Sequence, residues 1–244
     1  GLAAWAVPAA FACILWTILA ATARRRATAL ATSSSGLVAA RKGTTSLLRD
    51  RTAWAVTIYM ALQALVLYTV LAWFPSVYRT HGATPEAAGH LVSLSVLLGA
   101  PAALFVPKLL SRGRTQSGWG WLTPACVAAG LAGLLLFPGS ALWVWATLIG
   151  IGAGTAFPIA LTFVVIRSRD AIDAADLSAM SQNIGYLLAA SGPFVFGWLS
   201  DVTGGWQVPL TWLLSLMIVQ GVAGFHAGRP VYVREHPATL SRSG

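Results

Sequence analysis

The sequence predicts an all-α integral membrane protein with about seven transmembrane helices. The chain is 57% hydrophobic and only 9% charged, whereas about a quarter of the residues of a soluble domain are charged. Each of its apolar runs is near or above the roughly 20 residues that a helix needs to cross the hydrocarbon core. In order they are Leu2–Ala23, Thr52–Tyr78, Ala87–Leu110, Trp119–Phe137, Leu142–Ile166, Leu177–Ser200 and Gln207–Ala227. Because backbone in lipid must satisfy its own hydrogen bonds, we expect these runs to form a helical bundle.

The distribution of basic residues predicts an orientation in the membrane. Fifteen of the 16 Lys and Arg residues fall on one side if successive runs alternate in direction, and Arg79 is the exception. Basic loops of membrane proteins stay in the cytoplasm. We therefore expect a multi-pass protein of the cell (inner) membrane with a cytoplasmic carboxyl terminus. The same placement argues against nucleic acid as the partner of the +9 net charge.

A long basic linker divides the chain. Residues 1–23 form one predicted transmembrane helix, and residues 24–51 form a cytoplasmic linker rich in Ala, Thr, Ser and basic residues. Residues 52–228 form six spans joined by short loops, and residues 229–244 form a cytoplasmic tail. Because Gly1 begins directly within an apolar run, we interpret the chain as a piece of something longer.

Neutral polar side chains lie at membrane depth in the second run. Tyr59 and Gln63 are four residues apart and share a helix face, and Tyr68 follows them. An amide that faces lipid is costly, so we expect Gln63 to face protein or a water-filled cavity. Hydrogen bonding between helices is the alternative role for each of these residues.

The sixth run carries a second polar stripe in its inner half. Ser178, Gln182 and Tyr186 repeat every four residues, and Asn183 lies beside them. Helix–helix hydrogen bonding is again the alternative. Two separate runs that present amides and phenols supply more hydrogen-bonding capacity than packing requires, so we favour a shared solute cavity.

Small residues interrupt the fifth and sixth runs. They are Gly150, Gly152 and Gly154 in the fifth run, and Gly185, Gly192, Pro193 and Gly197 in the sixth. Glycines let a neighbouring helix approach closely. Gly-Pro softens a transmembrane helix, because neighbours satisfy the carbonyl that proline frees. We expect both runs to pack closely and the sixth to bend before it ends in a turn that begins at Asp201.

Charged side chains are absent from the middle of every run. The acidic residues lie in loops or at run ends, and either Asp173 or Asp176 is expected to cap the start of the sixth run. A proton relay usually shows as an intramembrane acid. Coupling to protons would therefore need another part of the protein, or His90, whose alternative role is that of a polar interfacial residue.

Catalytic chemistry finds no support in the sequence. It contains no metal-ligand cluster, no paired carboxylates and no nucleophile with a nearby His. We expect no catalytic residues, no metal, no cofactor and no enzyme activity.

The sixth run carries a family resemblance. Gly185-x6-Gly192-Pro193-x3-Gly197 resembles the glycine-proline motif on the eleventh of the twelve helices of major facilitator transporters, and "GWLSDVTGGW" resembles the segment that often follows it. "PKLLSRGRT", after the third run, resembles the family's cytoplasmic motif Gly-x-x-x-Asp-Arg-x-Gly-Arg. This copy is degenerate: Arg112 and Arg114 remain, but Pro107 and Ser111 replace Gly and Asp. The missing Asp puts any salt bridge of that motif in doubt.

Within this superfamily the chain is most similar to the cyanate-porter family, which includes cyanate and 2-nitroimidazole transporters. The segments Leu62–Tyr78, His90–Leu104 and Ile184–Trp206 carry the resemblance. It implies that the seven runs correspond to helices six to twelve of the major facilitator fold. The linker would be the central cytoplasmic loop, and the partners would be the lipid bilayer, a missing amino-terminal half and a small-molecule substrate.

The resemblance also implies a function. It suggests secondary active transport, by alternating access, of a small polar solute or organic anion that is cyanate-like or nitroimidazole-like. The expected substrate-binding residues are Gln63, Tyr68 and Trp73, with help from Tyr59, Gln182, Asn183 and Tyr186. The alternatives are a multidrug-type efflux transporter and a membrane protein that does not transport, which the short loops and the lack of a catalytic constellation disfavour.

Overall fold

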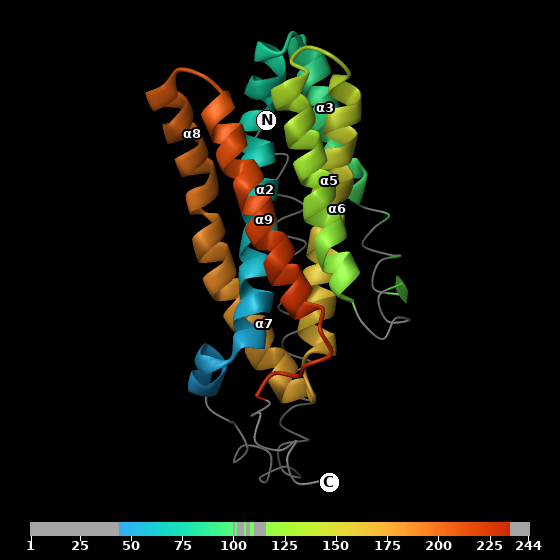
Figure 1. Cartoon of the computed structure of the whole chain (residues 1–244), viewed down its shortest axis with the longest axis vertical. Coiled ribbons are helices and arrows are strands. Elements are labelled where there is room, and N and C mark those ends of the chain that lie inside the picture. The colour runs from blue at the N-terminus through green and yellow to red at the C-terminus, as the bar shows by residue number, and fades with distance from the viewer. Residues whose placement is uncertain (1–43, 100, 102–104, 106–107, 110–115, 235–244) are drawn as a thin grey trace, which may run out of the picture. The chain divides into compact units, whose positions relative to one another are not determined.

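The structure is a computed structural model that describes residues 44–99, 101, 105, 108–109 and 116–234. All of them belong to the second of two compact units of the chain, Thr44–Gly244. The predictions for the first apolar run, for residues 24–43 and for Arg112 and Arg114 lie outside the described residues. Within the described ranges every regular element is a helix (Figure 1).

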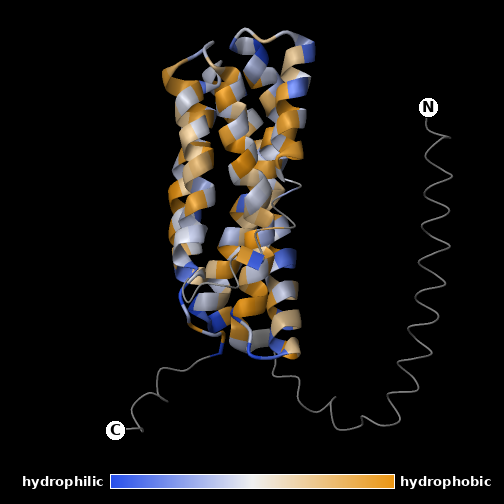
Figure 2. Ribbon diagram, turned by 90° about the vertical axis from the view of Figure 1, so that its right-hand side faces the viewer, coloured by the Kyte–Doolittle hydropathy of each residue, from blue (hydrophilic) through white to orange (hydrophobic). Residues whose placement is uncertain are grey.

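Helices run up and down between two ends of the bundle. In chain order they are the 3-10 helix η2 (Thr44–Arg49) and the α-helices α2 (Arg51–Thr80), α3 (Pro85–Leu97), α5 (Ser117–Leu136), α6 (Leu142–Ile166), α7 (Ala171–Ala189), α8 (Ser191–Thr203) and α9 (Gln207–Ala227). One end carries η2, the start of α7 and the segment after α9, and we call it the basic end (Figure 1). The loops after α2, α5 and α8 form the opposite end. Hydrophilic residues lie mainly near the two ends (Figure 2).

Helix α2 is the central element of the bundle. Asp50 begins it, because the carboxylate accepts hydrogen bonds from the backbone N–H groups of Thr52 at 2.7 Å and Ala53 at 3.0 Å. These donors have no partner within the helix itself. The helix packs against α3, α6, α7, α8 and α9. Most of its side chains from Ala53 to Val66 are therefore buried, which is how a helix that is apolar all round behaves.

Four of the described helices are long and apolar enough to cross a membrane, namely α2, α5, α6 and α9. Helices α6 and α9 begin and end where the apolar runs do. Helix α2 extends its predicted run by a residue or two at each end, and α5 begins and ends slightly earlier than predicted. The structure describes the third run only in part. Helix α3 begins at Pro85, two residues before the predicted run, and ends at Leu97.

The sixth apolar run differs from the prediction at its start. The helix begins at Ala171, six residues before Leu177, because the Ala-rich sequence before Leu177 favours a helix. Its N-cap is Asp170, whose carboxylate accepts a hydrogen bond from the Asp173 backbone N–H at 2.8 Å. The prediction that Asp173 or Asp176 caps this helix is therefore wrong, since both lie inside it.

The same run is broken near its middle. Helix α7 ends at Ala189 and α8 begins at Ser191. Pro193 has no N–H to donate to the carbonyl four residues earlier, so the regular hydrogen-bond pattern fails there. Ser191 donates from its hydroxyl to the Leu188 carbonyl at 2.7 Å, which gives one carbonyl at the break a partner. Gly204 ends α8 with a φ of 69°, a left-handed conformation that glycine adopts at little cost.

Glycines of α6 let two neighbouring helices approach its backbone. A Cβ atom at Gly150 would lie 2.5 Å from the Ser95 Cα, and one at Gly152 would lie 2.6 Å from the Thr123 carbonyl oxygen. A Cβ atom at Gly154 would lie 2.2 Å from the Gly99 Cα. Helix α6 therefore packs backbone to backbone against α5, and against α3 and the residue Gly99 that follows it, as small residues allow in membrane bundles.

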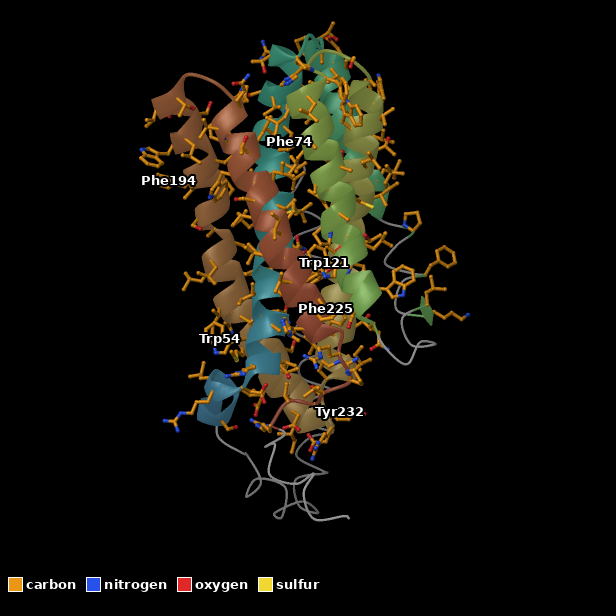
Figure 3. The ribbon with its side chains drawn as sticks, in the orientation of Figure 1. Trp54, Phe74, Trp121, Phe194, Phe225 and Tyr232 are labelled. Atoms are coloured by element: carbon orange, nitrogen blue, oxygen red, sulfur yellow. The ribbon has the colours of Figure 1, made fainter. Side chains whose placement is uncertain are left out.

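Aromatic side chains divide between the interior and the outer surface. Phe74 of α2 is fully buried and stacks on Phe196 of α8 with ring centroids 6.3 Å apart. Phe194, two residues before Phe196, points away from the bundle and is 75% exposed (Figure 3). An exposed Phe at mid-helix suits contact with lipid rather than with water.

Candidate functional site

A polar face lies across α2 and α7 and consists of Tyr68, Gln182, Asn183 and Tyr186. Tyr68 is 43% exposed and Tyr186 is 36% exposed. Tyr68 of α2 lies near Tyr186 of α7. Asn183 is also exposed, and Gln182 is partly exposed. The fold thus brings four of the seven predicted substrate-binding residues onto one accessible surface.

Hydrogen bonds on this face leave polar atoms available. Gln182 donates from its amide to the Ser178 hydroxyl at 2.7 Å, and Asn183 donates to the Ala179 carbonyl at 2.8 Å. Each of these bonds stays within α7, so it tethers the side chain without joining two helices. The described part of the structure assigns no hydrogen-bond partner to the side-chain oxygens of these two amides. The polar face can therefore both donate and accept hydrogen bonds.

The polar face carries no formal charge. In the sequence of α2 no charged residue occurs between Arg51 and Arg79, and in α7 none occurs after Asp176. Ion pairing is therefore not available from these stretches of the two helices. What they offer a bound molecule is amide and phenol hydrogen bonding together with aromatic surface.

Gln63 lies inside the bundle rather than on the polar face. Its side chain is only 2% exposed, and its amide nitrogen contacts the Met60 sulfur at 3.5 Å. The amide oxygen is buried and has no partner among the described residues. Leaving such an acceptor unpaired costs about 1–3 kcal/mol, so Gln63 remains a candidate for a role other than packing.

Tyr59 and Trp73 use their polar atoms to join helices. The Tyr59 hydroxyl lies 2.6 Å from the Thr123 hydroxyl of α5, and both residues are buried. The Trp73 indole N–H donates to the Pro193 carbonyl of α8 at 2.7 Å. For Tyr59 this helix–helix hydrogen bonding is the alternative role that the sequence leaves open.

The three glycines of the sixth run all face α2. A Cβ atom at Gly185 would lie 3.3 Å from the Ala61 nitrogen, and one at Gly192 would lie 2.5 Å from the Leu65 Cγ. At Gly197 a Cβ atom would lie 2.3 Å from the Trp73 Cζ2. These glycines and Pro193 therefore form the seam between α2 and the broken α7–α8 pair. Asp201 is exposed and lies within α8, which continues to Thr203, so the prediction that the turn begins at Asp201 is wrong.

A hub centred on Arg234 ties the basic end together, and it was not expected from the sequence. Its guanidinium forms ion pairs with Asp173 and with Asp176, the latter at 2.9 Å. Its Nε donates to the Ser46 hydroxyl at 2.8 Å, and its backbone N–H donates to the Asp50 carboxylate at 2.5 Å. Burial by itself lowers the pKa of Arg234, but hydrogen bonds to Asp176 and Asp173, together with their negative charges, outweigh burial and raise it. The guanidinium therefore stays a cation that joins η2, α2 and α7.

The residues just before Arg234 strengthen this hub. The Val233 N–H donates to the Arg167 carbonyl at the end of α6 at 2.9 Å, and the Val233 side chain is fully buried. The buried Arg167 guanidinium in turn donates to the Gln116 amide oxygen at the start of α5. Burial is the main influence on Arg167 and lowers its pKa. The segment after α9 therefore belongs to the folded bundle.

A hollow of about 580 Å³ opens at the opposite end of the bundle. Its lining includes Thr80, His81, Thr203 and Gln207. None of the polar-face residues lines it. The Thr80 and Thr203 hydroxyls bond to carbonyls of their own helices, at 2.8 Å and 2.6 Å. We therefore base the candidate site on the polar face and not on this hollow.

Long apolar helices, polar ends and an uncharged polar face define a polytopic helical membrane protein. The chain belongs to the Major Facilitator Superfamily, whose family model matches residues 2–190. This match covers most of the chain and includes α2, α3, α5, α6 and α7.

Several named transporters are similar to this chain. It is 41% identical over 189 residues to the uncharacterized transporter YycB of Bacillus subtilis (strain 168), covering 77% of this chain and 47% of the relative. It is 36% identical over 186 residues to the 2-nitroimidazole transporter of Escherichia coli (strain K12), covering 76% and 47%. It is 27% identical over 224 residues to the cyanate transport protein CynX of the same organism, covering 91% and 54%. The chain thus spans about half the length of these relatives.

Proposed function

We propose that this chain supplies the carboxyl-terminal half, together with the preceding helix, of a secondary active transporter for a small polar solute. The observation that carries the proposal is the uncharged polar face of Tyr68, Gln182, Asn183 and Tyr186. In lipid such a surface is costly unless it faces protein or water. An amino-terminal half placed opposite it would enclose a binding site near the middle of the membrane.

The composition of the face suggests how a solute is held. Amides and phenols can donate and accept hydrogen bonds, and the phenol rings can stack on a planar molecule. Because the polar face contains no Arg or Lys, it favours a neutral solute or an anion with delocalised charge over a carboxylate or phosphate. The names of two relatives, a 2-nitroimidazole transporter and a cyanate transport protein, are consistent with such solutes.

Gln63, Tyr59 and the glycines that face α2 have other roles in the proposed transporter. The unpaired oxygen of Gln63 lies on the same helix as Tyr68 and would gain a partner from solute or water when the site fills. Tyr59 does not contact the solute in this proposal but holds α2 against α5 through its hydrogen bond to Thr123. The glycine seam along α2 permits α7 and α8 to shift during alternating access.

Orientation follows from the ends of the bundle. Arg49, Arg51, Arg167, Arg229 and Arg234 gather at the basic end, which we assign to the cytoplasm of a cell (inner) membrane. The described carboxyl-terminal segment then lies in the cytoplasm. A multidrug-type efflux transporter is the second candidate, because the exposed phenols would also accept larger aromatic molecules.

Substitutions on one helix of the full-length protein test this proposal. Asn183→Ala and Tyr186→Phe should each lower solute uptake, because each removes hydrogen-bonding capacity from the polar face. Leu187→Ala is the matched control, since Leu187 is the next residue of α7 and is 77% exposed without polar atoms. Uptake of 2-nitroimidazole and cyanate into vesicles is the measurement. Equal uptake by all three variants and the wild type would overturn the assigned site.

A further inference from the structure

Trp73 of α2 contacts the first two turns of α8, just beyond the break between α7 and α8. Its indole N–H donates to the Pro193 carbonyl at 2.7 Å, across 120 residues of chain. In a regular helix that carbonyl would accept only from the N–H of residue 197. The second bond from Trp73 therefore attaches α2 to the first turn of α8, directly beyond the residue where the helix is interrupted.

The indole ring also fits a notch in α8. At Gly197 a Cβ atom would lie 2.3 Å from the ring carbon Cζ2 and 3.0 Å from Cε2. Any side chain at this position would displace the ring. Trp206, the N-cap residue of α9, lies with its ring centroid 5.8 Å from that of Trp73. The hydrogen bond and the notch therefore hold the same ring at two successive turns of α8.

We infer that Trp73 is a positioning residue that sets the angle between α7 and α8 during transport, rather than a residue that contacts the solute. This inference rests on the proposed function. The indole N–H is its one polar atom, and Pro193 already accepts from it, so it has nothing to offer a hydrogen-bonding solute. A helix interrupted at proline can bend, and a contact that grips one side of the break controls that bend.

The kinetic pattern follows from this role. A residue that contacts solute equally throughout the cycle changes KM when it is altered, whereas one that acts on the conformational change lowers kcat. Trp73→Phe keeps an aromatic ring but removes the N–H. We expect it to lower kcat by about three- to tenfold, the range for one lost hydrogen bond, with KM within about twofold of the wild type. Gly197→Ala should produce the same pattern, because it pushes the ring out of its notch.

Matched controls separate this effect from a general loss of packing. Trp206→Phe removes the indole that packs beside the Trp73 and Phe196 rings. Among the described residues this indole N–H has no hydrogen bond. Gly205→Ala adds a methyl group where nothing lies within 4 Å. Both controls should leave kcat and KM near their wild-type values.

The experiment uses the full-length protein in vesicles with 2-nitroimidazole as the probe, together with backbone hydrogen exchange of α8 in the purified protein. Trp73→Phe should accelerate exchange in the segment 191–197, and Trp206→Phe should not. A raised KM with unchanged kcat, or unchanged exchange in Trp73→Phe, would overturn the inference. If Trp73→Phe does not fold, Gly197→Ala against Gly205→Ala gives the same comparison. If the wild type transports no probe, the proposed function fails, while hydrogen exchange still decides whether Trp73 holds α8.

Discussion

The contact between α5 and α9 gives the sharpest stability prediction. The two helices approach at Gly120 and Gly224, where a Cβ atom added to Gly120 would lie 2.3 Å from the Gly224 carbonyl carbon and oxygen. Carbon atoms in contact normally lie about 3.5–4.0 Å apart. The Gly120→Ala change therefore forces the helices apart by more than about 1 Å. Overpacking of this kind costs about 1–3 kcal/mol.

The same helix provides a control. A Cβ atom at Gly118 would meet nothing within 4 Å. Alanine stabilises a helix relative to glycine by up to about 1 kcal/mol, and both variants receive this gain. We therefore expect Gly120→Ala to be less stable than Gly118→Ala by about 1–3 kcal/mol.

Thermal unfolding of the purified full-length protein in detergent measures this difference. Each kcal/mol shifts Tm by about 2–4 °C for a domain of 150–250 residues and by less for a longer protein. Gly118→Ala should unfold at or above the wild-type Tm, and Gly120→Ala should unfold a few degrees below Gly118→Ala. Equal Tm values for the two alanine variants would refute the close approach of α5 and α9 at Gly120.

Three further changes probe the polar contacts, each by thermal unfolding. Arg234→Gln should lower the free energy of unfolding by about 2–4 kcal/mol, because it leaves two nearly buried carboxylates without their cation. The control Arg229→Gln changes an exposed residue and should alter stability little. Equal effects of the two variants would contradict the hub. Tyr59→Phe should cost about 1–2 kcal/mol by removing the hydroxyl that meets the buried Thr123 hydroxyl, and a neutral result would contradict that bond. Gln63→Leu should leave stability unchanged or raise it, since it removes a buried oxygen that has no partner among the described residues. The same variant should abolish solute uptake, and full uptake would exclude Gln63 from the site.

Hydropathy was enough to predict the helices that lie wholly in the apolar part of the bundle. Helices α6 and α9 begin and end at the residues where the apolar runs do. The start of α7 was missed because hydropathy reports burial in lipid, whereas a helix can extend beyond the apolar stretch. Asp170 then becomes the N-cap, and Asp173 and Asp176 turn inward to meet Arg234.

The candidate site was predictable in its residue types and only partly in its geometry. The four-residue spacing predicted that Gln182 and Tyr186 share a face of α7, and in the structure Gln182 is partly exposed and Tyr186 is exposed. The sequence could not tell that Tyr68 is exposed while Gln63 is buried, because α2 is apolar on every side and shows no outward face. Likewise, nothing local to Trp73 or Arg234 reveals partners at Pro193 and Asp173, which are distant in the chain.

Solute uptake by the full-length protein tests whether the polar face belongs to a transport site. Labelled 2-nitroimidazole, cyanate and a panel of small anions would be offered to vesicles with and without a pH gradient, using wild-type protein and Asn183→Ala. We predict saturable uptake of at least one small planar or charge-delocalised solute, reduced by Asn183→Ala. Absence of uptake of every compound by protein shown to be folded would contradict it and favour efflux of larger molecules.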